Sequence, residues 1–107
     1  MENVKESVAY DLKTMISYAK GATVSKVLTK NKNGNTTLFA FEKGQGLSEH
    51  TAPFNATVII LEGRSKVTIA GNPHQLSEGE MIIMPANIPH ALEAITSFKM
   101  LLIMIKD

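Results

Sequence analysis

Three histidines and ten carboxylates are the side chains with which this chain of 107 residues could bind a metal or move protons. The chain has no cysteine, which excludes disulfides, iron–sulfur clusters, thiolate zinc sites and cysteine nucleophiles. His50 and His90 each follow a glycine- or proline-marked break at which we expect a strand to begin, and His74 stands beside the tip of an expected hairpin. A lone histidine is most often a surface or structural residue, so any functional argument depends on the spacing around His50 and His90.

The spacing of glycine, proline and histidine follows a regular frame. Its members are Gly44, His50, Gly63, Gly79, Pro85 and His90. Five residues stand between the first glycine and the first histidine, and five stand between the third glycine and the proline. This frame resembles the two motifs of the cupin superfamily over roughly residues 36–94. The resemblance implies an all-β fold, the cupin jelly-roll β-barrel (double-stranded β-helix), in a single domain that spans residues 1–107.

The resemblance also implies a metal site of three histidines and one glutamate, of which this chain keeps only His50 and His90. The positions of the other histidine and of the glutamate carry Ala52 and Ala56, neither of which can coordinate a metal. Two imidazoles fall short of the three protein ligands of most zinc sites and lack the carboxylate of typical oxygen-activating iron sites. We therefore expect His50 and His90 to be at most weak ligands of a divalent transition metal (Ni, Zn, Fe, Mn or Cu), with water or a bound carboxylate completing the shell.

Two other positions depart from the second motif, where Asn87 replaces a glycine and Ala94 replaces an asparagine. Asparagine is tolerable in the place of glycine because it enters the left-handed backbone region more readily than other residues. Glu49 and Glu93 lie near the histidines in sequence, but the period-two alternation of a strand places them on the opposite face. Only a β-bulge could redirect them toward the histidines.

The two alanines enlarge the cavity in which the missing ligands would lie, and this predicts a binding pocket. Its expected members are Ala52, Ala56, Phe54, Met84 and Leu92, and Met81 and Ile83 are further candidates whose direction the sequence leaves open. Methionine suits an adaptable apolar wall. Two histidines at the mouth of such a barrel can also hydrogen-bond to each other, to water or to an anionic ligand, with no metal.

Two functional hypotheses of different class remain open. In the first, the protein binds a small molecule, anionic or aromatic, in the barrel cavity without converting it. In the second, it is a metal-dependent enzyme of the dioxygenase or isomerase type, so the sequence leaves enzymatic activity undecided. Eleven basic residues balance ten acidic ones, so neither nucleic acid nor a membrane surface is expected as a partner.

The elements that must position these residues are predicted to be short strands between glycine-centred turns. This pattern is typical of an all-β sandwich or barrel. Strands are predicted at 23–29, 36–41, 57–61, 65–69, 81–84 and 98–105, with one more short strand that ends at 77. Residues 1–22 form an N-terminal segment ahead of the motif-bearing core. Within it, residues 11–20 have apolar side chains at helical spacing, and the same stretch is also compatible with an extended strand.

Some of these strands, such as 58–61, are apolar on both faces, so we expect the outer face of the barrel to be covered. A homodimer is the favoured expectation, and a second sheet or a loop of the same chain is the alternative. Charged residues interrupt the first twenty positions, and the longest apolar run, 100–105, is far shorter than the roughly 20 residues of a spanning helix. We therefore expect the protein to be cytoplasmic.

Overall fold

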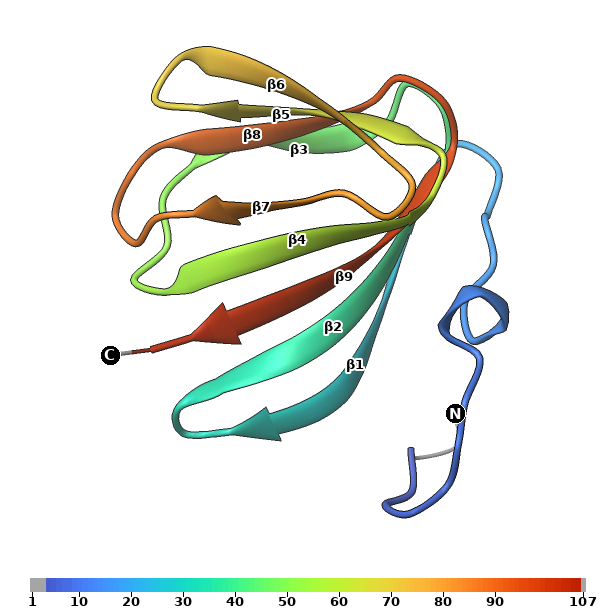
Figure 1. The fold of residues 1–107 in the computed structure, drawn as a ribbon. Helices are drawn as coiled ribbons and strands as arrows, with labels where there is room; N and C mark the ends of the chain where they lie inside the picture. The colour runs from blue at the N-terminus through green and yellow to red at the C-terminus, as the bar shows by residue number, and fades with distance from the viewer. Residues whose placement is uncertain (1–3, 107) are drawn as a thin grey trace.

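Alternating apolar and polar residues, separated by glycine-centred turns, form two antiparallel β-sheets that pack face to face (Figure 1). The computed structural model describes residues 4–106. Its strands are β1 (Thr23–Asn31), β2 (Gly34–Phe41), β3 (Gly46–His50), β4 (Asn55–Glu62), β5 (Arg64–Ile69), β6 (Asn72–Ser77), β7 (Met81–Met84), β8 (His90–Ala94) and β9 (Phe98–Ile105). One sheet has the order β1-β2-β9-β4-β7 and the other has the order β3-β8-β5-β6. The predicted all-β jelly-roll architecture is confirmed.

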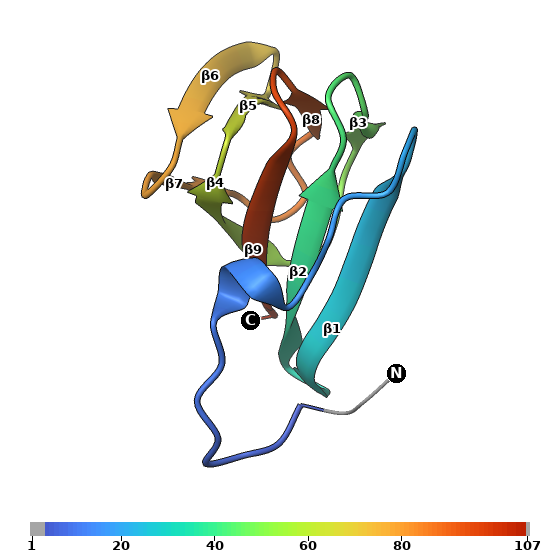
Figure 2. The same ribbon diagram turned by 90° about the vertical axis from the view of Figure 1, so that its right-hand side faces the viewer.

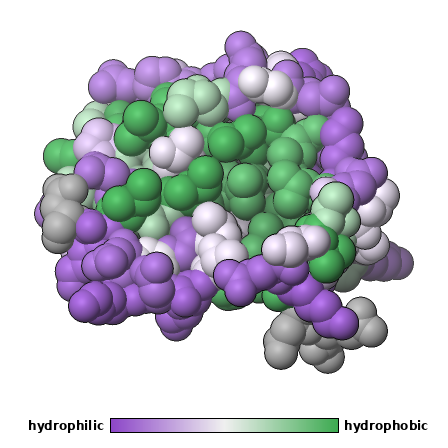
Figure 3. All heavy atoms as spheres, turned by 60° about the horizontal axis from the view of Figure 1, so that its bottom comes forward, coloured by the Kyte–Doolittle hydropathy of each residue, from purple (hydrophilic) through white to green (hydrophobic). Residues whose placement is uncertain are grey.

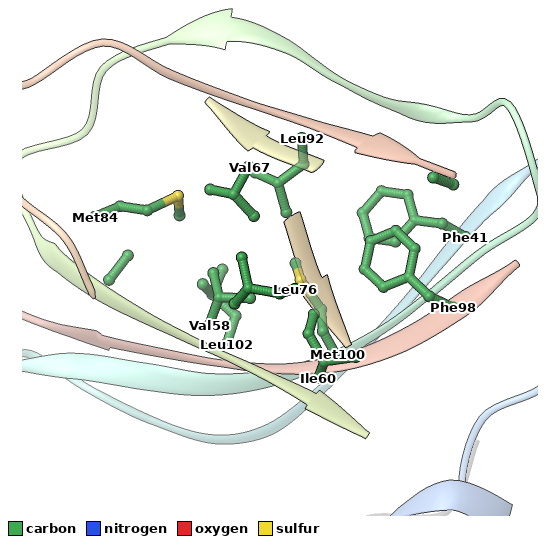
Figure 4. Close-up of a cluster of buried hydrophobic side chains, with 12 residues drawn as sticks. Phe41, Val58, Ile60, Val67, Leu76, Met84, Leu92, Phe98, Met100 and Leu102 are labelled. Atoms are coloured by element: carbon green, nitrogen blue, oxygen red, sulfur yellow. The ribbon is translucent and has the colours of Figure 1, made fainter. Parts of the chain in front are cut away.

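The hydrophobic core lies between the two sheets (Figure 4). The rings of Phe41 and Phe98 stack with their centroids 4.6 Å apart, at the opposite end of the core from Met84 (Figure 4). Both phenylalanines are fully buried, and each such side chain contributes about 1.5–3 kcal/mol by leaving water. The remaining buried members are Ala56, Val58, Ile60, Val67, Leu76, Leu92, Ala94, Met100 and Leu102. The two stacked rings therefore fill one end of the core.

The N-terminal segment crosses the outer face of the five-stranded sheet (Figure 2). Ile16 is buried there against Leu38 and Ala40 of β2. Tyr18 Oη donates a hydrogen bond of 2.6 Å to Oε2 of Glu62 at the end of β4. A segment of the same chain therefore covers one end of this apolar face.

Neither the helix nor the strand predicted for residues 11–20 is present. The stretch contains one short 3-10 turn, η1 (Leu12–Thr14), whose first turn is capped by the Asp11 carboxylate accepting from the backbone N–H of Lys13. A helix of ten residues is marginal in water, and packing of the apolar side chains onto the sheet keeps the rest of the stretch irregular. Within residues 4–106, no helix combines the length and the apolar character needed to cross a membrane.

The remainder of the same outer face is largely apolar and partly exposed, with a polar rim (Figure 3). One row of side chains runs across four neighbouring strands in register, formed by Thr36, Ile103, Thr57 and Ile83. No charged side chain interrupts this row, and Ile83 at its end is 53% exposed. A segment of the same chain therefore covers only one end of the outer face of the five-stranded sheet. For the remainder of that face, the homodimer stays a prediction.

Candidate functional site

Both histidines that the sequence singled out lie at one end of the sandwich. β3 ends at His50, β8 begins at His90, β7 ends at Met84, and β4 begins one residue before Ala56, all at the same side of the molecule (Figure 1). His50 and His90 are direct cross-strand partners of the β3–β8 pair. The predicted strand start is confirmed for His90 and wrong for His50, which is the last residue of its strand.

A β-bulge in β3 sets the direction of His50. Leu47 pairs with Leu92 and His50 pairs with His90, so three steps along β3 oppose two steps along β8. The extra residue cancels the alternation of strand faces. As a result Leu47 and His50, which are an odd number of residues apart, both line the cavity between the sheets.

The two imidazoles meet at close range in a fixed orientation. His90 Nε2 lies 3.1 Å from His50 Nε2, and the rings are nearly perpendicular, at 71°. The far nitrogen of each ring is held by the backbone. His50 Nδ1 lies 2.7 Å from the carbonyl oxygen of Ser48, and His90 Nδ1 lies 3.1 Å from the carbonyl oxygen of Ile88. The backbone therefore fixes both rings with their Nε2 atoms facing each other.

This arrangement determines where the protons are. A carbonyl oxygen only accepts hydrogen bonds, so each Nδ1 must be the protonated nitrogen of its ring. In a neutral imidazole with a protonated Nδ1, the Nε2 atom is a bare acceptor. Two bare acceptors at 3.1 Å repel each other unless a cation lies between them. The pair is therefore suited to hold one cation, either a proton that the two Nε2 atoms share or a metal ion.

A second proton on the pair is disfavoured. Burial lowers the pKa of the His90 imidazole below its ordinary value, the hydrogen bond to the Ile88 carbonyl opposes this by a smaller amount, and the neighbouring His50 lowers the pKa again. His90 is only 3% exposed, whereas His50 is exposed at the mouth. The protonated form of the His90 imidazole is therefore disfavoured.

Behind the histidines lies a largely enclosed cavity of about 210 Å³. It is lined by Phe39, Leu47, His50, Ala52, Ala56, Met84, His90, Leu92, Met100, Leu102 and Met104. Apart from the imidazoles, every one of these side chains is apolar. The cavity can therefore accept an apolar body, with a polar group only at the histidine end.

The structure brings together most of the predicted pocket residues but not all of them. Ala52, Ala56, Met84 and Leu92 line the cavity, and Phe54 does not. The prediction for Phe54 is wrong, because the chain bends at residues 53–54 and the bend breaks the alternation of faces between Ala52 and Ala56. Met81 and Ile83, whose direction the sequence left open, point to the outer surface and are exposed. Met84, on the same strand, points into the cavity.

Five lining residues were not predicted: Phe39, Leu47, Met100, Leu102 and Met104. Three of them alternate along β9, a strand that is apolar on both faces, so its sequence does not indicate which set faces inward. Leu47 faces inward only because of the bulge. The sequence contains no clear signal for that bulge.

The acidic side chains near the histidines point away from them. Glu93 Oε2 forms an ion pair of 3.2 Å with Lys66 Nζ on the outer surface, and Glu49 is exposed. Within residues 4–106, no group of three or more histidine, aspartate or glutamate residues could hold a metal. His74 is exposed on the edge strand β6 and is not among the lining residues. The two histidines are therefore the polar end of the cavity.

The connection between β7 and β8 is tied to the connection between β3 and β4. Asn87 has a positive φ of 63°, in the left-handed region that asparagine enters more readily than other non-glycine residues. Its backbone N–H donates to the carbonyl oxygen of Ala52 at 2.8 Å. The backbone N–H of Ala86 donates to Oδ1 of Asn55 at 3.0 Å. These bonds hold the cavity mouth in shape.

Comparison with known proteins identifies the family. The cupin domain family matches residues 37–106. The chain belongs to the cupin family. Among solved structures, this cupin is similar to a conserved protein of unknown function from Streptococcus pyogenes, with 34% identity, a TM-score of 0.93 and coverage of 99% of this chain and 93% of that one. A search of the curated proteins found no match.

Two further solved cupins are similar. A cupin 2 conserved barrel domain protein from Leptotrichia buccalis is 41% identical with a TM-score of 0.88. The match covers 91% of this chain and 47% of that one, so this cupin spans about half of its length. A cupin superfamily protein from Desulfitobacterium hafniense is 24% identical with a TM-score of 0.91, over 99% of this chain and 97% of that one. This last likeness supports the fold alone.

The histidine pair fits a metal ion as two of its ligands. Two nitrogens bound at about 2.0–2.1 Å to one ion, with bonds between perpendicular and tetrahedral, lie about 3 Å apart. The observed separation of 3.1 Å matches, and metal-bound histidines commonly donate the other ring N–H to a carbonyl. The carboxylate that cupin resemblance implies for the position of Ala56 has no counterpart in the cavity lining.

Proposed function

We propose that this cupin binds a small molecule with an apolar body and one acidic group in the cavity between its sheets. The observation that carries the proposal is the pairing of an apolar cavity with two imidazoles that need one cation between them. When that cation is a proton, the pair is an imidazolium joined to an imidazole. An acidic group at the cavity mouth then meets the only positive charge that the lining provides.

The volume of the cavity limits the size of the ligand. A cavity of about 150 Å³ lined by apolar side chains is known to hold benzene, so about 210 Å³ suits a molecule slightly larger than a benzene ring. Burial of such a body in the dry cavity is favourable because its apolar surface leaves water. A compact aromatic or branched aliphatic acid meets both requirements.

The acidic group gains a charge-assisted hydrogen bond. A carboxylate at the mouth accepts the proton that the two Nε2 atoms otherwise share, and a hydrogen bond between charged groups is worth about 1.5–3 kcal/mol net. A neutral ligand of the same shape gains nothing of this kind. The histidine pair therefore acts as the selectivity element, and the apolar walls supply the remaining affinity.

The alternative is a metal-dependent enzyme of the dioxygenase or isomerase type, in which His50 and His90 hold a divalent ion. The backbone-held Nδ1 atoms favour it, because such bonds orient metal-binding histidines. A bound ion would act as a Lewis acid toward a substrate oxygen. However, two neutral ligands are fewer than catalytic zinc takes from proteins and lack the carboxylate of typical iron sites, so the geometry supports binding better than catalysis.

Benzoate and benzyl alcohol are suitable probes for the test, because they share a ring and differ in charge. We expect benzoate to shift the amide resonances of β3, β7 and β8 in a ¹H–¹⁵N NMR titration and to bind at least tenfold more tightly than benzyl alcohol. His90→Ala should remove that preference, and His74→Ala, which changes an exposed histidine on β6, should retain it. Equal affinity for the two probes, or shifts confined to other surfaces, would contradict the proposal.

The enzyme alternative is tested by elemental analysis of protein purified without an affinity tag. A near-stoichiometric divalent metal that is lost in the His50→Ala and His90→Ala variants would favour the enzyme. Protein that takes up neither nickel, zinc, iron nor manganese would leave the binding function.

A further inference from the structure

Thioether sulfur is the second kind of potential ligand in the cavity lining. Three methionines line it, namely Met84, Met100 and Met104. Two of these are direct cross-strand neighbours of Ala56, with Met84 on β7 at one side and Met104 on β9 at the other. Ala56 occupies the position at which the cupin resemblance implies a glutamate ligand. Two thioether side chains therefore flank the position from which a carboxylate is missing.

We propose that the cavity mouth is a site for a soft monovalent metal ion, Cu(I), held by Nε2 of His50 and His90 together with the sulfurs of Met84 and Met104. Soft thioether ligands favour Cu(I) over harder divalent ions, and imidazole suits copper as well. The two nitrogens belong to the four-stranded sheet, and the two methionines line the same cavity from the facing five-stranded sheet, one on each side of Ala56. Four donors then come from four strands that share one end of the sandwich.

The charge of the cavity also selects a monovalent ion. Its lining holds no carboxylate, and no cysteine exists in the chain to supply a thiolate. A divalent ion in such surroundings would keep its full double charge in an apolar environment, and burying unpaired charge is costly. A monovalent ion needs less compensation, and it satisfies the requirement of the histidine pair for one cation.

Burial of two of the four donors limits the access of water to the site. Met84 is 2% exposed and His90 is 3% exposed, so water competes poorly for the ion there. His50 is exposed at the mouth and gives the ion a route from solvent to the pair. Exclusion of water also protects Cu(I) from hard oxygen ligands, which would favour its oxidation to Cu(II).

The inference rests on the proposed function in one respect, because it uses the same histidine pair as the holder of one cation. The copper ion takes the place of the shared proton. The two ideas nonetheless depend on different side chains. Binding of an organic acid needs the histidines and an apolar wall of any kind, whereas binding of Cu(I) needs the methionine sulfurs.

The decisive experiment is an anaerobic titration of the full chain with Cu(I) in competition with bicinchoninate, alongside a Zn(II) titration with a chromogenic chelator. We expect one Cu(I) per chain, bound at least 100-fold more tightly than Zn(II), with sulfur neighbours visible in the copper X-ray absorption spectrum. Spectra with nitrogen and oxygen neighbours only, or an equal affinity for Zn(II), would overturn the inference.

Conservative variants separate the roles of the side chains. Leucine replaces methionine in a core at a cost below about 1.5 kcal/mol, so the Met84→Leu/Met104→Leu variant should fold. Its Cu(I) affinity should fall at least tenfold. Met100→Leu is the matched control, because Met100 pairs with Ile60, four residues along β4 from Ala56 and about 13 Å away. Unchanged Cu(I) affinity in the double variant would overturn the inference.

The experiments distinguish a failure of the Cu(I) site from a failure of the proposed acid-binding function. Benzoate binding without Cu(I) binding would remove the copper site and leave the proposed function. Cu(I) binding without any preference for benzoate over benzyl alcohol would remove the proposed acid-binding function and leave the copper site.

Discussion

His50 and His90 face each other through their Nε2 atoms at 3.1 Å while each Nδ1 is held by a backbone carbonyl oxygen. The carbonyl two residues before each histidine, of Ser48 or of Ile88, provides the same anchor on both strands. The rings are therefore oriented before any ligand arrives. Preorganised donors of this kind cost little to bring together on binding.

The Ala52→His/Ala56→Glu variant should bind a divalent metal. Both alanines line the cavity beside the histidine pair, so the two substitutions add the ligands that the cupin resemblance implies. Ala56 is buried, and a glutamate there is an uncompensated buried group in the absence of metal. We expect the metal-free variant to be destabilised by about 2–4 kcal/mol, and its melting temperature to rise on addition of Zn(II) or Ni(II).

Thermal unfolding followed by circular dichroism with and without metal is the measurement. The single Ala52→His variant serves as the control, because three histidines without a carboxylate should give a smaller rise. Absence of any metal-dependent shift in the double variant would mean that these positions do not converge on the histidine pair.

The fold and the two histidines could be predicted from the sequence because both depend on short-range signals. Turn glycines and alternation define the strands, and the spacing from Gly44 to His50 and from Pro85 to His90 follows a fixed frame. The direction of Phe54 could not be predicted, because it depends on a bend between two strands. The inward positions on β9 could not be predicted either, because a central strand that is apolar on both faces has no alternation to interpret.

The hydrogen-bond partner of each Nδ1 atom could not be predicted from the sequence either. The backbone carbonyl oxygen of Ser48 is the atom that orients His50. The bulge between Leu47 and His50 makes this geometry, and it inverts the faces that a regular strand would assign. Prediction by alternation fails at such a bulge.

Tyr18→Phe should loosen the N-terminal segment. Tyr18 Oη donates to Glu62 at 2.6 Å, in a partly buried contact that also places Lys99 Nζ over the tyrosine ring. Loss of this bond should lower the free energy of unfolding by about 1–2 kcal/mol. The measurement is urea unfolding at pH 8, with Tyr10→Phe, which changes an exposed tyrosine of the same segment, as the control.

The same contact predicts a pH dependence. Burial raises the pKa of Tyr18 well above its ordinary value, and the hydrogen bond and the negative charge of Glu62 raise it further. The unfolded chain then loses the tyrosine proton above about pH 10 while the folded chain keeps it. This contribution to stability is complete below pH 10 and is lost as the pH rises further. Wild-type stability should therefore fall more steeply than that of Tyr18→Phe between about pH 9.5 and 11, and parallel slopes would contradict the assignment.

Gly63→Ala should be far more damaging than Gly71→Ala, although both glycines have a similar positive φ, 78° and 80°. At Gly63 an added Cβ would clash with the Ser97 carbonyl oxygen and with Phe98, whereas at Gly71 it would meet open space. The backbone cost alone is about 1–2 kcal/mol, and the clash at Gly63 should add about 2 kcal/mol more. Urea unfolding of both variants measures the difference in stability. Equal losses of stability would show that the backbone at the corner between β4 and β5 moves to accommodate the added methyl group.

The exposed part of the outer face of the five-stranded sheet should associate with a second copy of the chain. The row from Thr36 through Ile103 and Thr57 to Ile83 has no charged side chain, and homodimer interfaces are depleted of charge at their centre. Sedimentation equilibrium at micromolar concentration should give about twice the monomer mass of 11.7 kDa. A monomer throughout this range would contradict the prediction.

Ile83→Lys is the variant that tests the location of this interface, and Val27→Lys is its matched control. The two side chains are almost equally exposed, at 53% and 55%, so each lysine should leave the folded monomer intact. Val27 pairs with Thr37 and therefore lies on the opposite face of the sheet from Thr36. A lysine at position 83 would bring a charge without a partner into the interface, at the β7 end of the row, and should raise the dissociation constant at least tenfold, because an unpaired buried charge is costly. The control should sediment like the wild type. Dissociation by Val27→Lys in place of Ile83→Lys would move the interface to the other face of β1.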